Sequence, residues 1–168
     1  MIKDTAVLEA EKTFDEFIQY LSSIRSDSYN IIPFAGSWTP GQLAEHVILS
    51  AAGFVEILNG PVEDTRRDPE QHVGQLTTMF LDSSTKMESP EFIRPEEREY
   101  DQQDQVHSLR TIKVGLLKAV QTANLDKLCT AFELPVLGYL SGAEAVTFTT
   151  VHTQRHLHQL KNMINTME

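Results

Sequence analysis

Residues 37–47 read SWTPGQLAEHV, and this stretch marks the start of a helix. Thr39 is a suitable N-cap, and Pro40 fits the first helical position because that position needs no backbone N–H donor. Gln42 stands three residues after the cap and completes the capping-box pattern, in which the two residues bond to each other's backbone. The sequence therefore predicts that a helix begins at Pro40.

The same helix has an apolar face and a clear stop signal. Trp38 precedes the cap and can form a hydrophobic staple with Leu43, a structural role that explains it without a ligand. The triplet Asn59-Gly60-Pro61 ends the apolar pattern, because glycine favours the helix C-terminus and proline cannot continue it. We predict a helix over residues 40–58.

Three further helices follow from the same kinds of pattern. Ser141 and Glu144 form a second capping box, which predicts a final helix over residues 142–166. Apolar residues at a spacing of three and four predict helices over 5–25 and 100–122. Four amphipathic helices without an alternating strand pattern indicate an all-α bundle.

Two long connections join these helices. Residues 61–100 are too many for a structureless loop, so we expect a short helix over 71–81 and an extended, proline-flanked segment, SPEFIRPEERE, over 89–99. Residues 125–141 show little helical periodicity and are interrupted by a proline and a glycine. We predict a second crossover there, without strands.

The composition argues against several kinds of partner. The 168 residues include 24 acidic and 14 basic side chains, a formal net charge of −10, and the densest basic cluster is Arg66-Arg67. Nucleic-acid phosphates require clustered Lys and Arg. The charge-free apolar stretches 46–55 and 134–143 are far shorter than the roughly 20 residues of a membrane helix. We expect one domain over residues 1–168, with no nucleic-acid or membrane partner.

Two features indicate a cytoplasmic protein. Residues 1–14 carry acidic side chains where a signal peptide would have its apolar core. The only cysteine, Cys129, cannot form an intrachain disulfide. Because no base lies beside it in the sequence, we interpret Cys129 as a buried core thiol rather than a nucleophile.

Three of the six histidines fall on apolar helical faces. His152 and His156 are four residues apart and project from adjacent turns, and His46 shares its face with Leu43 and Val47. Burying a polar group without a partner costs roughly 1–3 kcal/mol. One divalent ion would satisfy all three imidazoles, which would occupy three corners of a tetrahedron and leave the fourth open.

A second interpretation stays open, in which these histidines are core residues bonded to backbone carbonyls. The sequence alone does not show that the helices over 40–58 and 142–166 face each other. The remaining histidines, His72, His107 and His158, are predicted to lie outside the cluster.

Other polar residues could serve such a site. Arg155 lies beside the histidine pair and can either reach an anionic substrate or face water. Ligand histidines usually donate their second N–H to a carboxylate, amide or carbonyl. The side chains considered for that role are Gln42, Glu45, Asp101, Asp104 and Gln159.

Two segments resemble the DinB/YfiT-like superfamily in their order and separation. WTPGQLAEHV, at residues 38–47, resembles the family segment W-[ST]-P-x5-H and places a family ligand on His46. LGYLSGAEAVTFTTVHTQRHLHQL resembles the last-helix segment, whose H-x3-H falls on His152 and His156. KMESPEFIRP, at 86–95, also resembles the proline-flanked crossover of many members.

The resemblance implies a four-helix up-up-down-down bundle with two long crossover connections, in many members a homodimer. It implies a zinc- or nickel-type divalent ion on His46, His152 and His156. It further implies a metal-dependent enzyme that activates a thiol or a water, as a thiol S-transferase or a hydrolase of small molecules, with a low-molecular-weight thiol as co-substrate. The alternative is a non-catalytic helical bundle, with structural or absent metal, that binds a protein partner.

Overall fold

Both predicted capping boxes are present in the structure, a computed structural model that describes residues 1–168. Thr39 Oγ1 accepts from the Gln42 backbone N–H at 3.1 Å, and Gln42 Oε1 accepts from the Thr39 N–H at 3.0 Å. This box begins α2, Pro40–Asn59. The box of Ser141 and Glu144 has bonds of 3.0 and 2.9 Å and begins α5, Gly142–Met167.

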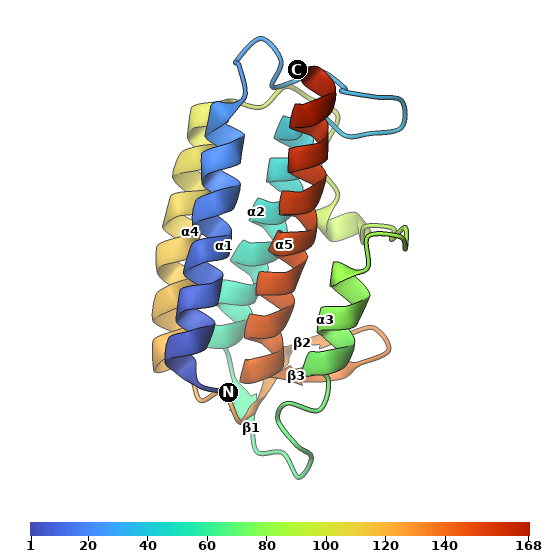
Figure 1. Ribbon diagram of the computed structural model, residues 1–168. Coiled ribbons are helices and arrows are strands. Elements are labelled where there is room, and N and C mark those ends of the chain that lie inside the picture. Colours follow the sequence, from blue (N-terminus) through green and yellow to red (C-terminus); the bar gives the residue numbers. More distant parts are fainter.

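The other two long helices are α1, Lys3–Ser23, and α4, Gln102–Thr122. The Asp101 carboxylate caps α4 by accepting from the Asp104 N–H at 2.9 Å. The four long helices stand side by side in Figure 1, and their apolar faces meet in one core. Fully buried core side chains include Phe14, Phe17, Leu21, Leu43, Val47, Leu109, Leu116 and Leu160.

Contacts near the helix ends show that α1 and α4 are antiparallel. Lys3 Nζ, at the start of α1, donates to the Ala123 carbonyl after the end of α4 at 2.6 Å. Gln102 Nε2, at the start of α4, donates to the Leu21 carbonyl near the end of α1 at 2.8 Å.

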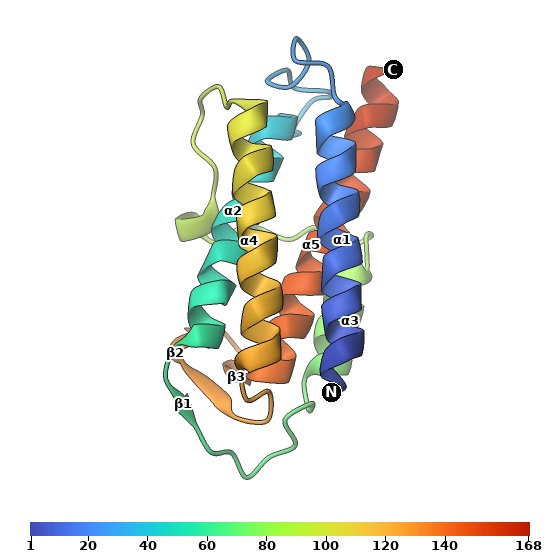
Figure 2. The ribbon, with the colours of Figure 1, turned by 90° about the vertical axis from the view of Figure 1, so that its left-hand side faces the viewer.

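Helix α2 runs parallel to α4 and antiparallel to α5. Gln105 Nε2, early in α4, donates to the Gly41 carbonyl, early in α2, at 3.0 Å. The ring centroids of Phe54, late in α2, and Phe148, early in α5, are 4.5 Å apart. In chain order the long helices therefore run up, down, down, up, as Figures 1 and 2 show.

The expected up-up-down-down order is therefore wrong. The connection over residues 24–39 turns back at one end of the bundle, and only the connection over 60–101 passes from one end to the other (Figure 2). Helical periodicity fixes which face of a helix is buried, but not the direction of its axis, so the sequence pattern could not distinguish the two orders.

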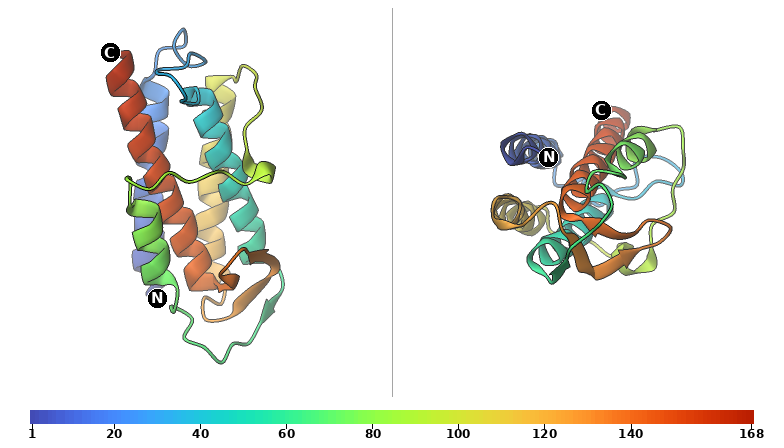
Figure 3. Two further views of the ribbon diagram at one scale, coloured as in Figure 1. Left: turned by 90° about the vertical axis from the view of Figure 1, so that its right-hand side faces the viewer. Right: turned by 90° about the horizontal axis from the view of Figure 1, so that it is seen from below.

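A small antiparallel sheet lies at the end of the bundle where α2 ends and α5 begins (Figure 3). Its strands, in spatial order, are β1 (Val62–Glu63), β2 (Leu128–Leu134) and β3 (Gly138–Ser141). The registers pair Val62 with Cys129 and Leu128 with Ser141. The prediction of a strandless crossover over 125–141 is wrong, because this connection is a β-hairpin that stays at one end of the bundle.

The connection from α2 to α4 contains the predicted short helix, α3 (Val73–Leu81), and a 3-10 turn, η1 (Glu91–Ile93). Helix α3 packs against α5 and buries Leu76 and Phe80. The chain then crosses the outside of α5 and α2 (Figure 3, left). We call residues 82–94 the strap.

Helix α2 is the only helix long and apolar enough to cross a membrane by length and composition. It lies in the bundle against α4 and α5, and its polar residues His46 and Ser50 are buried there. This is the pattern of a core helix.

Candidate metal centre

The three predicted histidines meet between α2 and α5. His46 lies early in α2, and His152 and His156 lie on successive turns of α5. His152 Nε2 is 3.0 Å from His46 Nε2 and 3.0 Å from His156 Nε2. The three residues are 3%, 5% and 6% exposed, in the order His46, His152, His156. The structure thus brings all three together in the interior.

The other ring nitrogens of two histidines are held by acceptors. His46 Nδ1 is 2.8 Å from the Ile93 carbonyl oxygen, and His156 Nδ1 is 2.7 Å from Gln159 Oε1. A carbonyl oxygen can only accept, so both Nδ1 atoms carry their hydrogens. In neutral His46 and His156 the Nε2 atoms therefore present lone pairs, and both lone pairs are directed at His152.

Burial keeps all three imidazoles neutral. It lowers the pKa of His46 and lowers that of His156 to about 3. Burial, followed by the proximity of His156 and His46, lowers the pKa of His152 well below its ordinary value. A single hydrogen on His152 Nε2 cannot fully satisfy the two lone pairs of His46 and His156, so the cluster is suited to binding a metal cation.

The geometry fits a transition-metal ion. The donor atoms of the three histidines lie within 4.8 Å of one another. Tetrahedral zinc with nitrogen ligands at roughly 2.0–2.1 Å places those nitrogens about 3.3 Å apart, close to the two spacings of 3.0 Å. Neutral imidazoles with fixed tautomers are also the form that binds metal.

Aromatic rings surround the cluster. The Trp38 ring centroid is 5.2 Å from that of His46, and the centroids of Phe80 and Phe148 are each 5.6 Å from that of His152. The sequence favours a staple role for Trp38 over one in lining a pocket, and the structure also places its ring against His46, a candidate metal ligand. These apolar walls lower the local dielectric, which strengthens the attraction between an ion and its ligands.

Only one of the five polar side chains considered as partners contacts a histidine of the cluster, and that is Gln159. The partner of His46 is the Ile93 carbonyl, with Ser89 Oγ 3.2 Å from the same nitrogen. Sequence reasoning missed both, because a backbone carbonyl has no residue-type signature. The others act elsewhere: Gln42 and Asp101 cap helices, Asp104 is exposed, and Glu45 accepts from Gln105.

Arg155 binds backbone carbonyls and makes no hydrogen bond to a histidine of the cluster. Its Nη1 donates to the carbonyls of Phe80 and Asp82 at 3.3 and 2.9 Å, and its Nη2 donates to that of Thr85 at 2.5 Å. The guanidinium therefore holds the end of α3 and the start of the strap. A role in binding an anionic substrate stays a prediction.

The remaining histidines and the cysteine lie apart from the cluster. His107 and His158 are exposed, and His72 is half-buried at the start of α3. Cys129 is buried in β2, and burial raises the pKa of its thiol, in keeping with a core residue.

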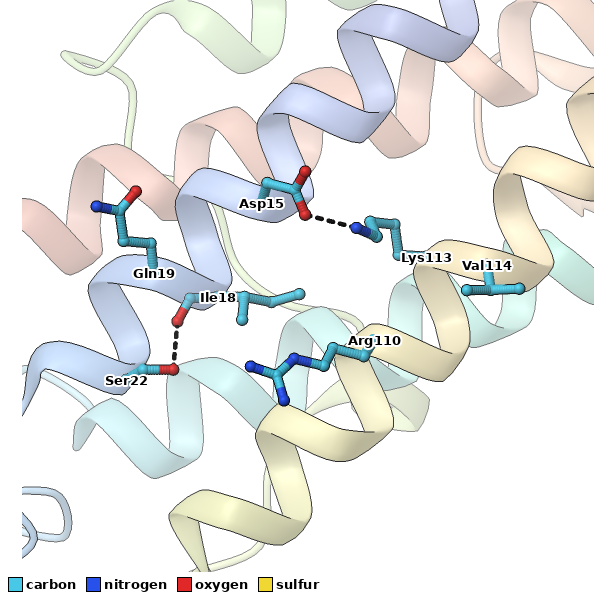
Figure 4. A pocket seen from close by; sticks show the side chains of 7 residues that line it. All are labelled: Asp15, Ile18, Gln19, Ser22, Arg110, Lys113 and Val114. Carbon is cyan, nitrogen blue, oxygen red and sulfur yellow. Dashed lines mark hydrogen bonds and ion pairs between the residues drawn. The ribbon is translucent and has the colours of Figure 1, made fainter.

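A surface groove lies between α1 and α4, and none of the histidines lines it (Figure 4). Asp15 and Lys113 form an ion pair of 2.6 Å across it, and Arg110 projects beside them without a bonded partner. Its only carboxylate, Asp15, is already paired with Lys113, so the histidine cluster is the better candidate for chemistry.

Comparison with known proteins agrees with this fold. Residues 9–160 match the DinB superfamily, and the chain belongs to that superfamily. A solved structure described as TT2238, a four-helix bundle protein, is similar over 95% of this chain and 98% of that chain, with a TM-score of 0.61 and 18% sequence identity. At that identity the likeness shows the fold alone. No curated protein matches the chain.

Proposed function

We propose that the protein is a metal-dependent enzyme whose ion, of zinc or nickel type, is held by His46, His152 and His156. The observation that carries this proposal is the convergence of three buried Nε2 atoms while two of the Nδ1 atoms are bonded elsewhere. Sites with three protein ligands and an open fourth position are typical of catalytic rather than structural zinc.

A zinc- or nickel-type ion at this position would act as a Lewis acid. It would lower the pKa of a bound water or thiol toward neutrality, so that the bound group could serve as a nucleophile. We infer transfer of a low-molecular-weight thiol to a small-molecule substrate ahead of hydrolysis. The Ile93 carbonyl and the Gln159 amide orient two ligand imidazoles, and Trp38, Phe80 and Phe148 keep water from the ring faces.

Elemental analysis tests the ion first. Untagged protein purified without chelator is compared with His46→Ala and with the exposed control His158→Ala. We expect about one zinc or nickel per chain in the wild type and the control, and none in His46→Ala. An absence of bound metal, even after incubation with zinc, would show that the histidines are core residues of a non-catalytic bundle.

Activity and chelation separate a catalytic from a structural ion. Loaded protein is assayed with low-molecular-weight bacterial thiols and electrophilic small molecules, and with ester and amide substrates for hydrolysis. A catalytic ion can be removed by chelator with the helical circular-dichroism signal retained. Unfolding on chelation would favour the alternative of a structural ion in a partner-binding bundle.

A further inference from the structure

The strap, residues 82–94, contacts the bundle with almost no buried side chains. From Asp82 to Phe92 every side chain except that of Ser89 is exposed, and Ile93 is only half-buried. A segment that buries so little apolar surface gains little free energy from packing. Such segments open locally at a lower free energy than the helices around them.

Polar contacts at two places hold the strap closed. At its start, the Arg155 guanidinium donates to the carbonyls of Asp82 and Thr85. At its end, His46 Nδ1 donates to the Ile93 carbonyl, with Ser89 Oγ 3.2 Å from the same nitrogen. Between these two anchors the chain crosses the pair of helices that carries the three histidines (Figure 3, left).

An outside molecule can reach the buried histidines only if some covering segment moves. None of the three exceeds 6% exposure, so a small molecule cannot approach their Nε2 atoms in this conformation. The strap lies over the cluster, contacts His46 directly and is fastened to Arg155, which lies between the other two ligands in sequence. The four long helices, in contrast, are tied into the core.

We propose that the strap is a lid that opens over the three-histidine centre while the bundle stays folded, and that its closure is linked to metal occupancy. The linkage rests on the proposed function and passes through one contact, from His46 Nδ1 to the Ile93 carbonyl. The carbonyl that orients the imidazole belongs to the lid, so opening removes that acceptor. An ion on His46 therefore favours the closed strap, and the closed strap slows release of the ion.

Hydrogen exchange of the metal-free protein tests the lid itself. The Ile93 and Arg94 amides, which bond only to Pro90 and Glu91 within the strap, should exchange at least about 100-fold faster than amides in the middle of α2 and α5. Arg155→Met removes the bonds at the start of the strap. It should speed amide exchange at the start of the strap by about tenfold and leave the exchange rates of the α5 amides unchanged. The matched control is Arg110→Met, which replaces an exposed arginine on α4 and should change the exchange rates of neither the strap nor α5 (Figure 4).

Zinc tests the linkage. Zinc should slow exchange at Ile93 and Arg94 by about tenfold or more. Transfer of zinc to a chromogenic chelator should be about tenfold faster from Arg155→Met than from the wild type or Arg110→Met, with one zinc per chain retained in all three at saturation.

The outcomes separate the lid from the proposed function. The lid would be overturned, whether or not zinc binds, if the strap amides exchanged as slowly as those of α2 and α5. It would also be overturned if Arg155→Met left the exchange rates of the strap amides unchanged. Zinc that binds without slowing strap exchange would overturn the linkage. A failure of zinc to bind would overturn the linkage and the proposed function, while the metal-free measurement would still decide whether the strap opens.

Discussion

Arg67 and Glu144 form a two-pronged ion pair between the connection after β1 and the start of α5. The two guanidinium Nη atoms each donate to one carboxylate oxygen at 2.7 Å. The Glu144 side chain is fully buried, and it also accepts from the backbone N–H groups of His72 and Ser141 at 2.9 Å. One carboxylate thus fixes the long connection, the end of β3 and the first turn of α5.

Removing the arginine should destabilise the fold strongly, because it leaves a buried carboxylate without its cation. For Arg67→Met we expect a loss of about 3 kcal/mol in the free energy of unfolding, the lower end of the range for broken buried pairs since Arg67 is partly exposed. Urea denaturation followed by circular dichroism measures it. The neighbouring exposed Arg66→Met is the control, and an equal loss there would refute a specific role for the pair.

The same carboxylate predicts a loss of stability in acid. Burial would raise the pKa of Glu144, but the Arg67 guanidinium and the N–H groups of Ser141 and His72 outweigh it and lower the pKa below its ordinary value of 4.5. Its contribution is therefore complete above about pH 4.5 and is lost as the pH falls through the lowered pKa. Urea midpoints between pH 7 and pH 3 should fall less steeply for Glu144→Gln than for the wild type, and parallel slopes would contradict this assignment.

The face of α5 that carries the ligands can be tested with two histidines of one helix. His152→Ala should abolish stoichiometric metal binding while the helical circular-dichroism signal is retained. His158→Ala should bind metal as the wild type does, because His158 is exposed and its nearest bonded side chain is Asn162. Loss of metal in His158→Ala would show that the assigned ligand face is wrong.

The amide of Gln159 should support the metal site without being a ligand. Gln159→Ala removes the acceptor of His156 Nδ1–H, so the imidazole loses its fixed orientation. We expect zinc affinity to fall about 10- to 100-fold, as for other partners of ligand histidines. Competition with a chelator measures the affinity. Gln154→Ala, which removes a half-buried glutamine bonded to Thr13, should leave it unchanged.

Two glycines should respond oppositely to alanine. A Cβ at Gly142 would lie 2.7 Å from the Leu125 Cα, so Gly142→Ala forces the backbone apart and should destabilise by about 1–3 kcal/mol. At Gly53, within α2, a Cβ meets nothing within 4 Å, and Gly53→Ala should stabilise by about 0.5–1 kcal/mol through helix propensity. Thermal denaturation of the two variants should shift in opposite directions.

The features predicted correctly from the sequence are those encoded over a few neighbouring residues. The capping box of Thr39 and Gln42 is a local hydrogen-bond pattern, and its reciprocal bonds are present as expected. The pair His152 and His156 is likewise set by the spacing of a helical turn. Its meeting with His46 depended on tertiary packing, and it was the resemblance to a known family that favoured the pairing.

The hairpin was missed because its strands are short and their signal is weak. In β2 the half-buried Phe132 and Leu134 alternate with the exposed Ala131 and Glu133, a run too brief to stand out from a loop. The strand β1, which pairs with β2 on the side opposite β3, has only two residues and could not show alternation at all. The turn does have a sequence signal in Gly138, which adopts φ +73°.

The three-histidine centre also forms only in a chain that has folded completely. His46 and His152 are separated by 106 residues. They meet only when α5, the last helix of the chain, has packed against α2. A partly folded chain, or one with α5 misplaced, presents isolated imidazoles that bind metal far more weakly than the complete set. If the centre binds its ion as proposed, the ratio of tightly bound ion to protein therefore counts the molecules that have completed folding, and metal content becomes an assay of native yield in any variant that keeps the three histidines.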